Sequence, residues 1–437
     1  MKKINLSELN NHINEEIVLF GFVDKVRDLQ YVQFIILRDR TGIVQITVEK
    51  NNDFSKLNEV VKKLKIDSVL KVYGKVLVNE KVKLGGIEVI PSNIEILSEP
   101  VSEMPFYYKD LNGVNLDTRL DYRYLDLRNE RNNLIFQIQS CFVKAMRNYL
   151  ENNDFIEIHT PRLIGSASES GSEVFEVKYF DDKAYLAQSP QFYKQMAMAA
   201  GFEKIYEIGP VFRAENSNTN RHATEYTSFD LELSYIDSYL DVMDLEEDLL
   251  IAGLQEVKNR YGEVIKSKFG VEVIVPKKPF PRIKLQDLYQ ELEKRYGYHI
   301  PEEDIGDMNA ETEKLTSRYA MEEYGHEFIF VTDFAKTKRA FYHMRKNDIP
   351  QGYDLLWRGM EITTGAQREH RYDILVEQAR EKGLGKDVQY YLEFFKYGCP
   401  PHGGFAIGID RITMLLLGLS TLKESMLLFR GPSRLIP

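Results

Sequence analysis

The chain has 437 residues, with 57 Lys and Arg against 67 Asp and Glu and a formal net charge of -10. This length predicts two or three domains in a soluble globular protein, and a negative balance argues against coating nucleic acid by bulk charge. No apolar run approaches the roughly 20 residues that span a bilayer, and the start lacks the apolar core of a secretory signal. The two cysteines, Cys141 and Cys399, form no metal-type pair, which excludes a disulfide framework and favours a cytoplasmic location.

The first hundred residues differ from the rest in charge. They carry 15 basic and 14 acidic side chains, which leaves 42 basic and 53 acidic for residues 101–437. Eight lysines fall between positions 56 and 83. The N-terminal region is therefore nearly neutral with a lysine-rich stretch, whereas the remainder is acidic.

Residues 17–97 read as a small β-barrel. Runs of apolar and alternating residues predict strands and one helix in the order strand 17–28, strand 31–39, strand 42–49, helix 54–65, strand 68–79 and strand 86–97. Three strands, a helix and two strands is the order of an OB-fold, which commonly binds single-stranded nucleic acid. The pattern leaves a purely structural barrel open.

A polar, tyrosine-rich connector then leads into an amphipathic helix. One face of this helix carries Leu134, Ile138, Cys141, Ala145 and Tyr149. The remaining strands and helices show no regular βαβ alternation, so we expect an α+β fold in which helices flank a mainly antiparallel sheet. The predicted domains are an OB-fold over 1–104, a hinge over 105–130 and a catalytic domain over 131–437.

Several common catalytic motifs are absent from the sequence. There is no GxxxxGK[ST] loop, no GxSxG elbow and no HExxH pair. A hairpin over 209–232 offers another way to bind phosphate, because Arg213 on one strand and Tyr226 on the other could clamp a phosphate and stack a purine. Taken alone, the hairpin is only moderately specific, because an Arg–Glu pair across two strands, here with Glu215, is more often a plain ion pair.

Three segments in order carry a family resemblance. NNDFIEIHTPRL contains Pro161, GPVFRAENSNTNRHATEYTSFDLE contains Arg213, and PPHGGFAIGIDRITMLLLG contains Arg411. They resemble motifs 1, 2 and 3 of the class II aminoacyl-tRNA synthetases. The segments AQSPQFYKQ, GMEITTGAQREHRYD, FKYGCPPHGGF and the terminal RLIP extend the resemblance over nearly the whole chain, to the aspartyl-tRNA synthetases of the compact archaeal and eukaryotic type in subclass IIb.

The resemblance implies ATP-dependent activation of L-aspartate and its transfer to the 3′-end of tRNA(Asp), with Mg²⁺ as cofactor. It leaves open whether tRNA(Asn) is charged as well. It also implies a homodimer, formed through the motif 1 helix and Pro161, that does not bind membranes. Two alternatives stay open: an asparaginyl-tRNA synthetase, and a non-catalytic paralogue that only binds RNA.

For the nucleotide, the resemblance assigns catalytic roles to three arginines. Arg213 would hold the α-phosphate and Arg411 the γ-phosphate end, while Arg368 acts on the amino acid. The adenine would stack on Tyr226. The ATP pocket would be completed by Glu215, Arg221, His222 and Glu361.

Two acids in YDLLWRGMEIT are predicted to face the ATP-linked Mg²⁺. Asp354 and Glu361 are seven residues apart on what reads as one strand, so a twist or bulge must bring them together. The resemblance adds Thr364 as a further oxygen donor, both to the metal and beside the aspartate. Magnesium favours such a sparse oxygen set combined with phosphate and water.

The choice of amino acid is expected to depend on Lys194 and Arg368, because a side-chain carboxylate needs cationic partners. Without the resemblance, Lys194 would read as a surface lysine on an amphipathic helix. The resemblance also places four further residues around the substrate: Glu169, Gln191, Asp230 and His402. His402 is expected to add positive or hydrogen-bonding character.

The barrel is expected to read the anticodon. The resemblance places Arg27, Phe34 and Gln45 against anticodon bases, in a single-strand mode that needs an aromatic platform. From pattern alone, Phe34 is equally consistent with the barrel core.

Overall fold

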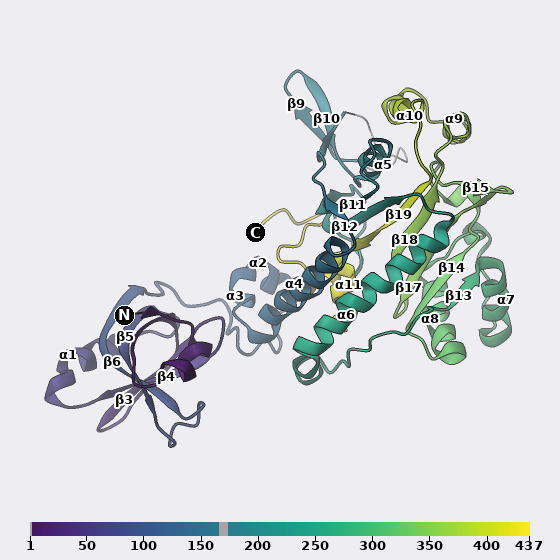
Figure 1. Cartoon of the computed structure of the whole chain (residues 1–437). Helices are drawn as coiled ribbons and strands as arrows, with labels where there is room; N and C mark the ends of the chain where they lie inside the picture. The colour runs from purple at the N-terminus through teal and green to yellow at the C-terminus, as the bar shows by residue number, and fades with distance from the viewer. Residues whose placement is uncertain (1, 166–173) are drawn as a thin grey trace. The chain divides into compact units, whose positions relative to one another are not determined.

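The structure, a computed structural model, describes residues 2–165 and 174–437. It divides into two compact units, Met1–Tyr107 and Tyr108–Pro437, drawn in Figure 1. Within the connector predicted as a hinge, two short helices, α2 (Leu116–Asp121) and α3 (Arg123–Asp126), belong to the second unit.

The first unit is a closed barrel. Its elements are β1 (Lys2–Lys3), β2 (Glu16–Asp28), β3 (Val32–Arg38), β4 (Ile43–Glu49), α1 (Ser55–Lys63), β5 (Val69–Val78) and β6 (Ile87–Ser98). The strand order is β1-β2-β3-β4-β6-β5, and β2 also pairs with β5, so the sheet closes on itself. Ile35 and Leu37 alternate with outward residues and pack inside with Ile46. The predicted order of strands and helix is confirmed.

The second unit is built around one large sheet. Its strands are β7 (Ile156–Glu157), β11 (Lys204–Phe212), β12 (Glu225–Ser234), β13 (Arg282–Lys284), β14 (Phe328–Thr332), β17 (Gly352–Trp357), β18 (Met360–Arg368) and β19 (His402–Gly408). They lie in the order β13-β14-β17-β18-β19-β12-β11-β7. Only the pairs at the two ends, β13–β14 and β7–β11, are parallel among the described pairings of this sheet. The expected mainly antiparallel sheet is confirmed.

The helices and small strands of this unit surround the sheet. The longer helices are α4 (Glu130–Glu151), α5 (Gln191–Ala199), α6 (Tyr239–Phe269), α7 (Leu285–Tyr296), α8 (Ala310–Tyr324), α9 (Tyr372–Glu381), α10 (Gln389–Phe395) and α11 (Ile409–Leu416), followed by the short α12 (Leu422–Ser425). Two further small sheets contain β8 (Leu163–Ile164), β9 (Glu176–Tyr179) and β10 (Asp182–Leu186), and β15 (Arg345–Lys346) with β16 (Ile349–Pro350).

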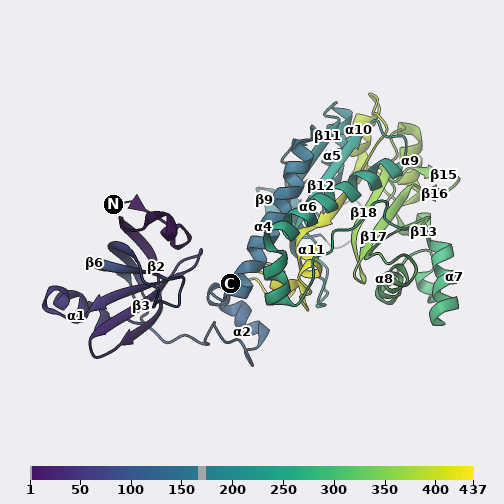
Figure 2. The same ribbon diagram turned by 60° about the horizontal axis from the view of Figure 1, so that its bottom comes forward.

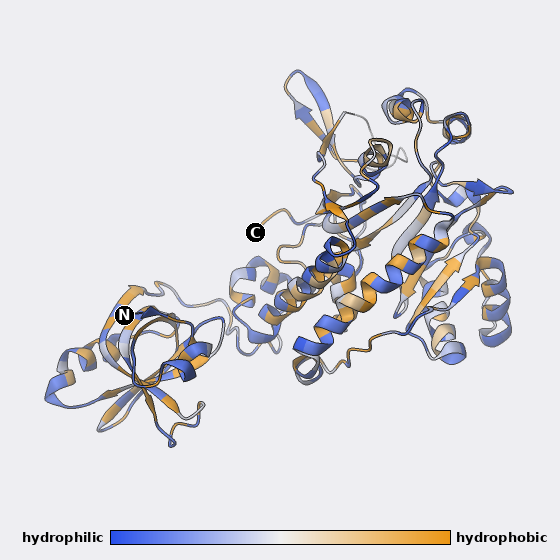
Figure 3. Ribbon diagram, viewed as in Figure 1, coloured by the Kyte–Doolittle hydropathy of each residue, from blue (hydrophilic) through white to orange (hydrophobic). Residues whose placement is uncertain are grey.

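Two long helices cover one face of the sheet. In Figures 1 and 2, α4 and α6 lie side by side across the strands. Figure 3 shows that both helices carry hydrophobic and hydrophilic residues, as expected of helices with one buried side. Leu134, Ile138 and Cys141 of the predicted apolar face are buried in the core under this layer.

Successive side chains of a strand point to opposite faces of the sheet, so one face packs in the core and the other faces the site. On β12, Phe229 and Leu231 enter the apolar core, whereas Asp230 and Glu232 point to the opposite face. In this way the sheet presents its polar side chains to a cavity on the face away from the core.

Candidate active site

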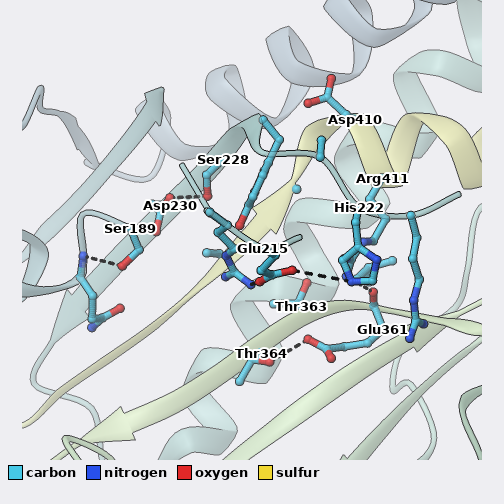
Figure 4. A pocket seen from close by; sticks show the side chains of 18 of the residues that line it. Ser189, Glu215, His222, Ser228, Asp230, Glu361, Thr363, Thr364, Asp410 and Arg411 are labelled. Atoms are coloured by element: carbon cyan, nitrogen blue, oxygen red, sulfur yellow. Dashed lines mark hydrogen bonds and ion pairs between the residues drawn. The ribbon is translucent and has the colours of Figure 1, made fainter. Parts of the chain in front are cut away.

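A cavity of about 400 Å³ lies over the central strands of the large sheet. Most of its lining comes from β12, β18 and β19, the loop between β11 and β12, and the helices α5, α8 and α11. Figure 4 shows side chains from β12, β18, α11 and the loop between β11 and β12 around it. The predicted site residues that line the cavity are Gln191, Arg213, Glu215, Arg221, His222, Tyr226, Asp230, Glu361, Thr364, Arg368 and Arg411.

One end of the cavity is closed by buried ion pairs. Lys194 is 1% exposed, and its Nζ lies 3.0 Å from Oδ1 of Asp230 and 3.5 Å from Oε2 of Glu232. Arg368 donates from Nε to Oε1 of Glu232 at 2.9 Å. Burial opposes the ionisation of Glu232, but the charges of Arg368 and Lys194 outweigh it and hold its pKa below the ordinary value. Lys194 is thus a buried cation rather than a surface lysine.

The backbone beneath these pairs is glycine for a steric reason. Gly404 of β19 lies opposite Glu232 in the sheet register. A Cβ at Gly404 would lie 2.5 Å from Oε2 of Glu232, and the Gly404 carbonyl accepts a hydrogen bond from Nη2 of Arg368 at 2.9 Å. The glycine-rich strand therefore leaves room for the Arg368–Glu232 pair.

A hydrogen-bonded chain leads from Gln191 to His402. The Gln191 amide donates to Oε1 of Gln195 at 3.1 Å, and Nε2 of Gln195 lies 3.0 Å from Nε2 of His402. Nδ1 of His402 lies 2.8 Å from the Pro400 carbonyl. His402 is fully buried, and burial lowers its pKa to about 4. Its ring is therefore neutral near pH 7 and supplies hydrogen bonds rather than the positive charge considered from sequence.

The other end of the cavity carries the predicted nucleotide residues. The guanidinium carbon of Arg213 lies 5.7 Å from the ring centre of Tyr226, close enough for one ligand to touch both. Burial raises the pKa of Tyr226, so its hydroxyl stays neutral. Glu215 lies 3.8 Å from Arg213 and 3.9 Å from Nε2 of His222, and Figure 4 shows Glu215 and His222 facing each other.

The two predicted metal-binding acids lie on two strands. Asp354 belongs to β17 and Glu361 to β18, with the turn at Arg358 and Gly359 between them, so the expectation of a single strand is wrong. Arg358 and Gly359 have φ of 50° and 86°, the left-handed values that a tight hairpin turn requires. The sequence pattern does not reveal this turn, because it lacks the Asn-Gly or Asp-Gly pair that usually marks a hairpin.

A bulge brings Glu361 beside Thr364. In the β17–β18 register Leu356 pairs with Glu361 and Leu355 with Thr363, so Ile362 is an extra residue. The Thr364 hydroxyl lies 2.8 Å from Oε1 of Glu361 and 2.9 Å from Oδ1 of Asp354. In a regular strand, residues three apart would point to opposite faces.

Asp354 is already paired within the protein. Arg339 donates to both of its carboxylate oxygens, at 2.9 and 2.6 Å. Burial raises the pKa of Asp354, against the lowering effect of Arg339. Among the residues that the structure describes, no cluster of three His, Cys, Asp or Glu side chains has the spacing to hold a metal ion. The oxygen set consists of two carboxylates and one hydroxyl, which suits Mg²⁺ when phosphate and water supply the rest.

Two acids that line the cavity were not predicted as site residues. Glu313 of α8 is 6% exposed, and its Oε2 accepts from Nη1 of Arg221 at 2.8 Å. Asp410 accepts from the Thr227 N–H at 3.1 Å, and burial raises its pKa to about 6. Glu313 lies in an acidic helix with no motif around it. The sequence therefore gives no signal for it, and only the folded structure shows that it contacts Arg221. The predicted Glu169 lies outside the described residues.

On the barrel, the predicted anticodon residues share the outer face. Arg27 of β2 pairs in register with Phe34 of β3, and Gln45 of β4 pairs with Ile36. Arg27 is exposed, and Phe34 and Gln45 are half-buried, while Ile35 and Leu37 fill the interior. Phe34 is therefore not a core residue.

Comparisons with known proteins agree with this architecture. A family model of class II tRNA synthetases (D, K and N) matches residues 115–430, and a model of the OB-fold nucleic acid binding domain matches residues 17–97. In the part of the chain that is described, no helix is long and apolar enough to cross a membrane.

Similar proteins cover almost the full chain. The aspartate–tRNA(Asp/Asn) ligase of Methanopyrus kandleri is 45% identical over 97% of this chain and 96% of its own. The aspartate–tRNA(Asp) ligase of Pyrococcus abyssi is 42% identical over 99% and 98%. The structure of asparaginyl-tRNA synthetase from Pyrococcus horikoshii with asparaginyl-adenylate matches with a TM-score of 0.90 at 31% identity, and covers 100% of both chains. On these grounds the chain belongs to the class II tRNA synthetases of the D, K and N group and carries an N-terminal OB-fold.

Proposed function

We propose that the protein is an aspartate–tRNA ligase, which forms aspartyl-adenylate from L-aspartate and ATP and transfers the aspartyl group to the 3′-end of tRNA(Asp). The observation that carries this proposal is the buried set of Lys194 and Arg368 with Asp230 and Glu232 at one end of the cavity. Cations held there suit a substrate whose side chain is a carboxylate, and Asp230 offers an acceptor for the substrate ammonium.

In the first step an oxygen of the aspartate α-carboxylate attacks the α-phosphorus of ATP, and pyrophosphate leaves. No side-chain nucleophile is required, so the protein acts by positioning the reactants and neutralising charge. Arg213 is assigned to the α-phosphate and Arg411 to the γ-phosphate end, with adenine against Tyr226. In the second step a terminal ribose hydroxyl of the tRNA attacks the adenylate carbonyl, and AMP leaves.

Arg368 is the cation that reaches the amino acid from the cavity wall. Lys194 does not line the cavity but pairs with Asp230, which does, and its positive charge offsets the carboxylate of Asp230. Gln191, His402 and Glu169 complete the aspartate site in this proposal, through hydrogen bonds and the ammonium.

Glu361, Thr364 and Asp354 would hold Mg²⁺, and of the three Glu361 and Thr364 line the cavity. When bound, the ion would neutralise phosphate charge and orient the pyrophosphate. Thr364 hydrogen-bonds to both carboxylates and Arg339 to Asp354, and these contacts hold the oxygen set together.

The proposal includes two macromolecular partners. Arg27, Phe34 and Gln45 on the outer barrel face are assigned to the anticodon of tRNA(Asp) and, as in the relatives named for both tRNAs, of tRNA(Asn). A second copy of the chain would pack on α4 and the segment around Pro161, where Ile156 and Leu163 are each 49% exposed.

Pyrophosphate exchange with each amino acid tests the proposal. We expect exchange with aspartate and little with asparagine, and the reverse result would make the protein an asparaginyl-tRNA synthetase. Tight tRNA binding with no exchange at all would support a non-catalytic paralogue. Charging of purified tRNA(Asp) and tRNA(Asn) then decides how many tRNAs are substrates.

A further inference from the structure

Glu313 sits at the junction of three elements around the nucleotide end of the cavity. It belongs to the first turn of α8, where Oδ1 of Asn309 caps the helix by accepting from the N–H groups of Glu311 and Thr312. The neighbouring Glu311 is exposed, whereas Glu313 is 6% exposed and faces the cavity.

One carboxylate oxygen of Glu313 makes two contacts. Its Oε2 accepts from Nη1 of Arg221 at 2.8 Å and from the backbone N–H of Glu361 at 3.2 Å. The Glu361 carbonyl accepts from Nη1 of Arg411 at 2.9 Å. The backbone of Glu361, beside the bulge at Ile362, is therefore held from both sides by charged side chains.

A second residue of α8 holds the same hairpin. Ser317 lies one turn after Glu313, on the same side of the helix, and its Oγ accepts from the N–H of Gly359 at 2.7 Å. Gly359 is in the left-handed turn between β17 and β18. The helix α8 thus accepts hydrogen bonds from the backbone of the turn and of the residue beside the bulge. These two irregularities of the hairpin determine the direction of the Glu361 side chain.

We propose that Glu313 is a positioning residue for ATP, which fixes the guanidinium of Arg221 and the backbone of Glu361 before the nucleotide binds. This inference rests on the proposed function for the identity of the nucleotide. A guanidinium has five N–H donors, so one bond to Glu313 leaves donors for a phosphate. The carboxylate also balances the charge of Arg221 in a half-buried place, where a loose cation would sample many rotamers.

Three variants of the full-length protein test the role. Glu313→Ala removes both contacts, Glu313→Gln keeps an acceptor oxygen, and Glu311→Gln is a matched control on the exposed side of α8. ATP binding by titration calorimetry is measured first, without any amino acid. Pyrophosphate exchange then gives kcat and the KM values for ATP and aspartate.

We expect Glu313→Ala to weaken ATP binding and raise KM for ATP by about tenfold or more, since a hydrogen bond to a charged group is lost. KM for aspartate should stay within about twofold, and Glu313→Gln should recover most of the ATP affinity. Equal rises in both KM values with a lowered unfolding midpoint, or ATP binding like that of Glu311→Gln, would overturn the role. If wild-type protein shows no aspartate-dependent exchange, the proposed function fails, while the ATP titrations still decide the role of Glu313.

Discussion

Nζ of Lys194 lies 3.0 Å from Oδ1 of Asp230, and the two side chains are only 1% and 2% exposed. Glu232 lies 3.5 Å from the same ammonium and pairs with Arg368 at 2.9 Å. Two cations and two anions therefore form one buried set without net charge. Removing any member leaves its partner as an unpaired charge in the interior, which costs far more than loss of a surface pair.

Lys194→Leu should therefore damage both folding and aspartate activation. We expect the free energy of unfolding to fall by about 3–5 kcal/mol, because Asp230 and Glu232 lose a buried cation. Aspartate-dependent pyrophosphate exchange should be nearly abolished, with ATP affinity little changed. Urea denaturation, exchange kinetics and ATP titration measure the three quantities.

A double variant separates the two effects. Lys194→Leu combined with Asp230→Asn removes the unpaired carboxylate, so part of the stability should return while exchange stays low. Unchanged aspartate kinetics in the single variant would show that this end of the cavity does not select the amino acid.

Glu246 of α6 should make the free energy of unfolding fall as the pH rises from about 4.5 to about 8. It is fully buried, receives a hydrogen bond from the Tyr353 hydroxyl at 2.7 Å, and burial raises its pKa from 4.5 to about 8. The folded state thus keeps a proton that the unfolded state releases between these values. The stabilisation is complete below pH 4.5 and is lost as the pH rises through 8.

Glu246→Gln should flatten this dependence, because a neutral amide has no proton to lose. The unfolding free energies of wild type and variant, measured at pH 6 and pH 9, should differ in slope. Glu263→Gln, at an exposed position of the same helix, serves as the control and should follow the wild type. Parallel wild-type and Glu246→Gln curves would contradict the assignment.

Much of the fold can be predicted from short segments of the sequence. The barrel strands alternate apolar and polar residues, and the motif segments contain the arginines and the glycine-rich strand, so each can be read from a few adjacent positions. The connection of Glu313 to Arg221 and Glu361 spans distant parts of the chain and has no such signal.

The β17–β18 hairpin shows why a strand pattern can mislead. The run from Asp354 to Glu361 has the composition of one strand, and its turn uses Arg358 and Gly359 instead of a strong turn pair. The turn is stabilised by hydrogen bonds to distant parts of the chain: Arg358 donates to Glu327, and the Gly359 N–H donates to Ser317. The burial of Lys194 cannot be predicted from the residue pattern of its helix either. It depends on packing against β12, which carries Asp230 and Glu232.

Thr364→Val tests the oxygen set between the two acids. Valine keeps the shape of threonine but removes the hydroxyl that lies between Asp354 and Glu361, so the carboxylates lose a common hydrogen-bond partner. We expect about a tenfold loss in exchange rate at low Mg²⁺, with partial recovery at high Mg²⁺. Thr364→Ser keeps the hydroxyl and should remain close to wild type; equal losses in both variants would point to packing instead.

Phe34→Ala tests the outer face of the barrel as the anticodon platform. Phe34 is half-buried beside Arg27 in the register, so its truncation removes a stacking surface without opening the core. We expect tRNA affinity to fall by about 1–3 kcal/mol, while exchange without tRNA stays unchanged. Phe20→Ala is the control, because Phe20 is also half-buried on the barrel but contacts Lys3 and Lys71. Equal losses of affinity in the two variants would place the tRNA contact elsewhere on the barrel, since Phe34 pairs in register with Arg27 whereas Phe20 pairs with Lys71 of β5.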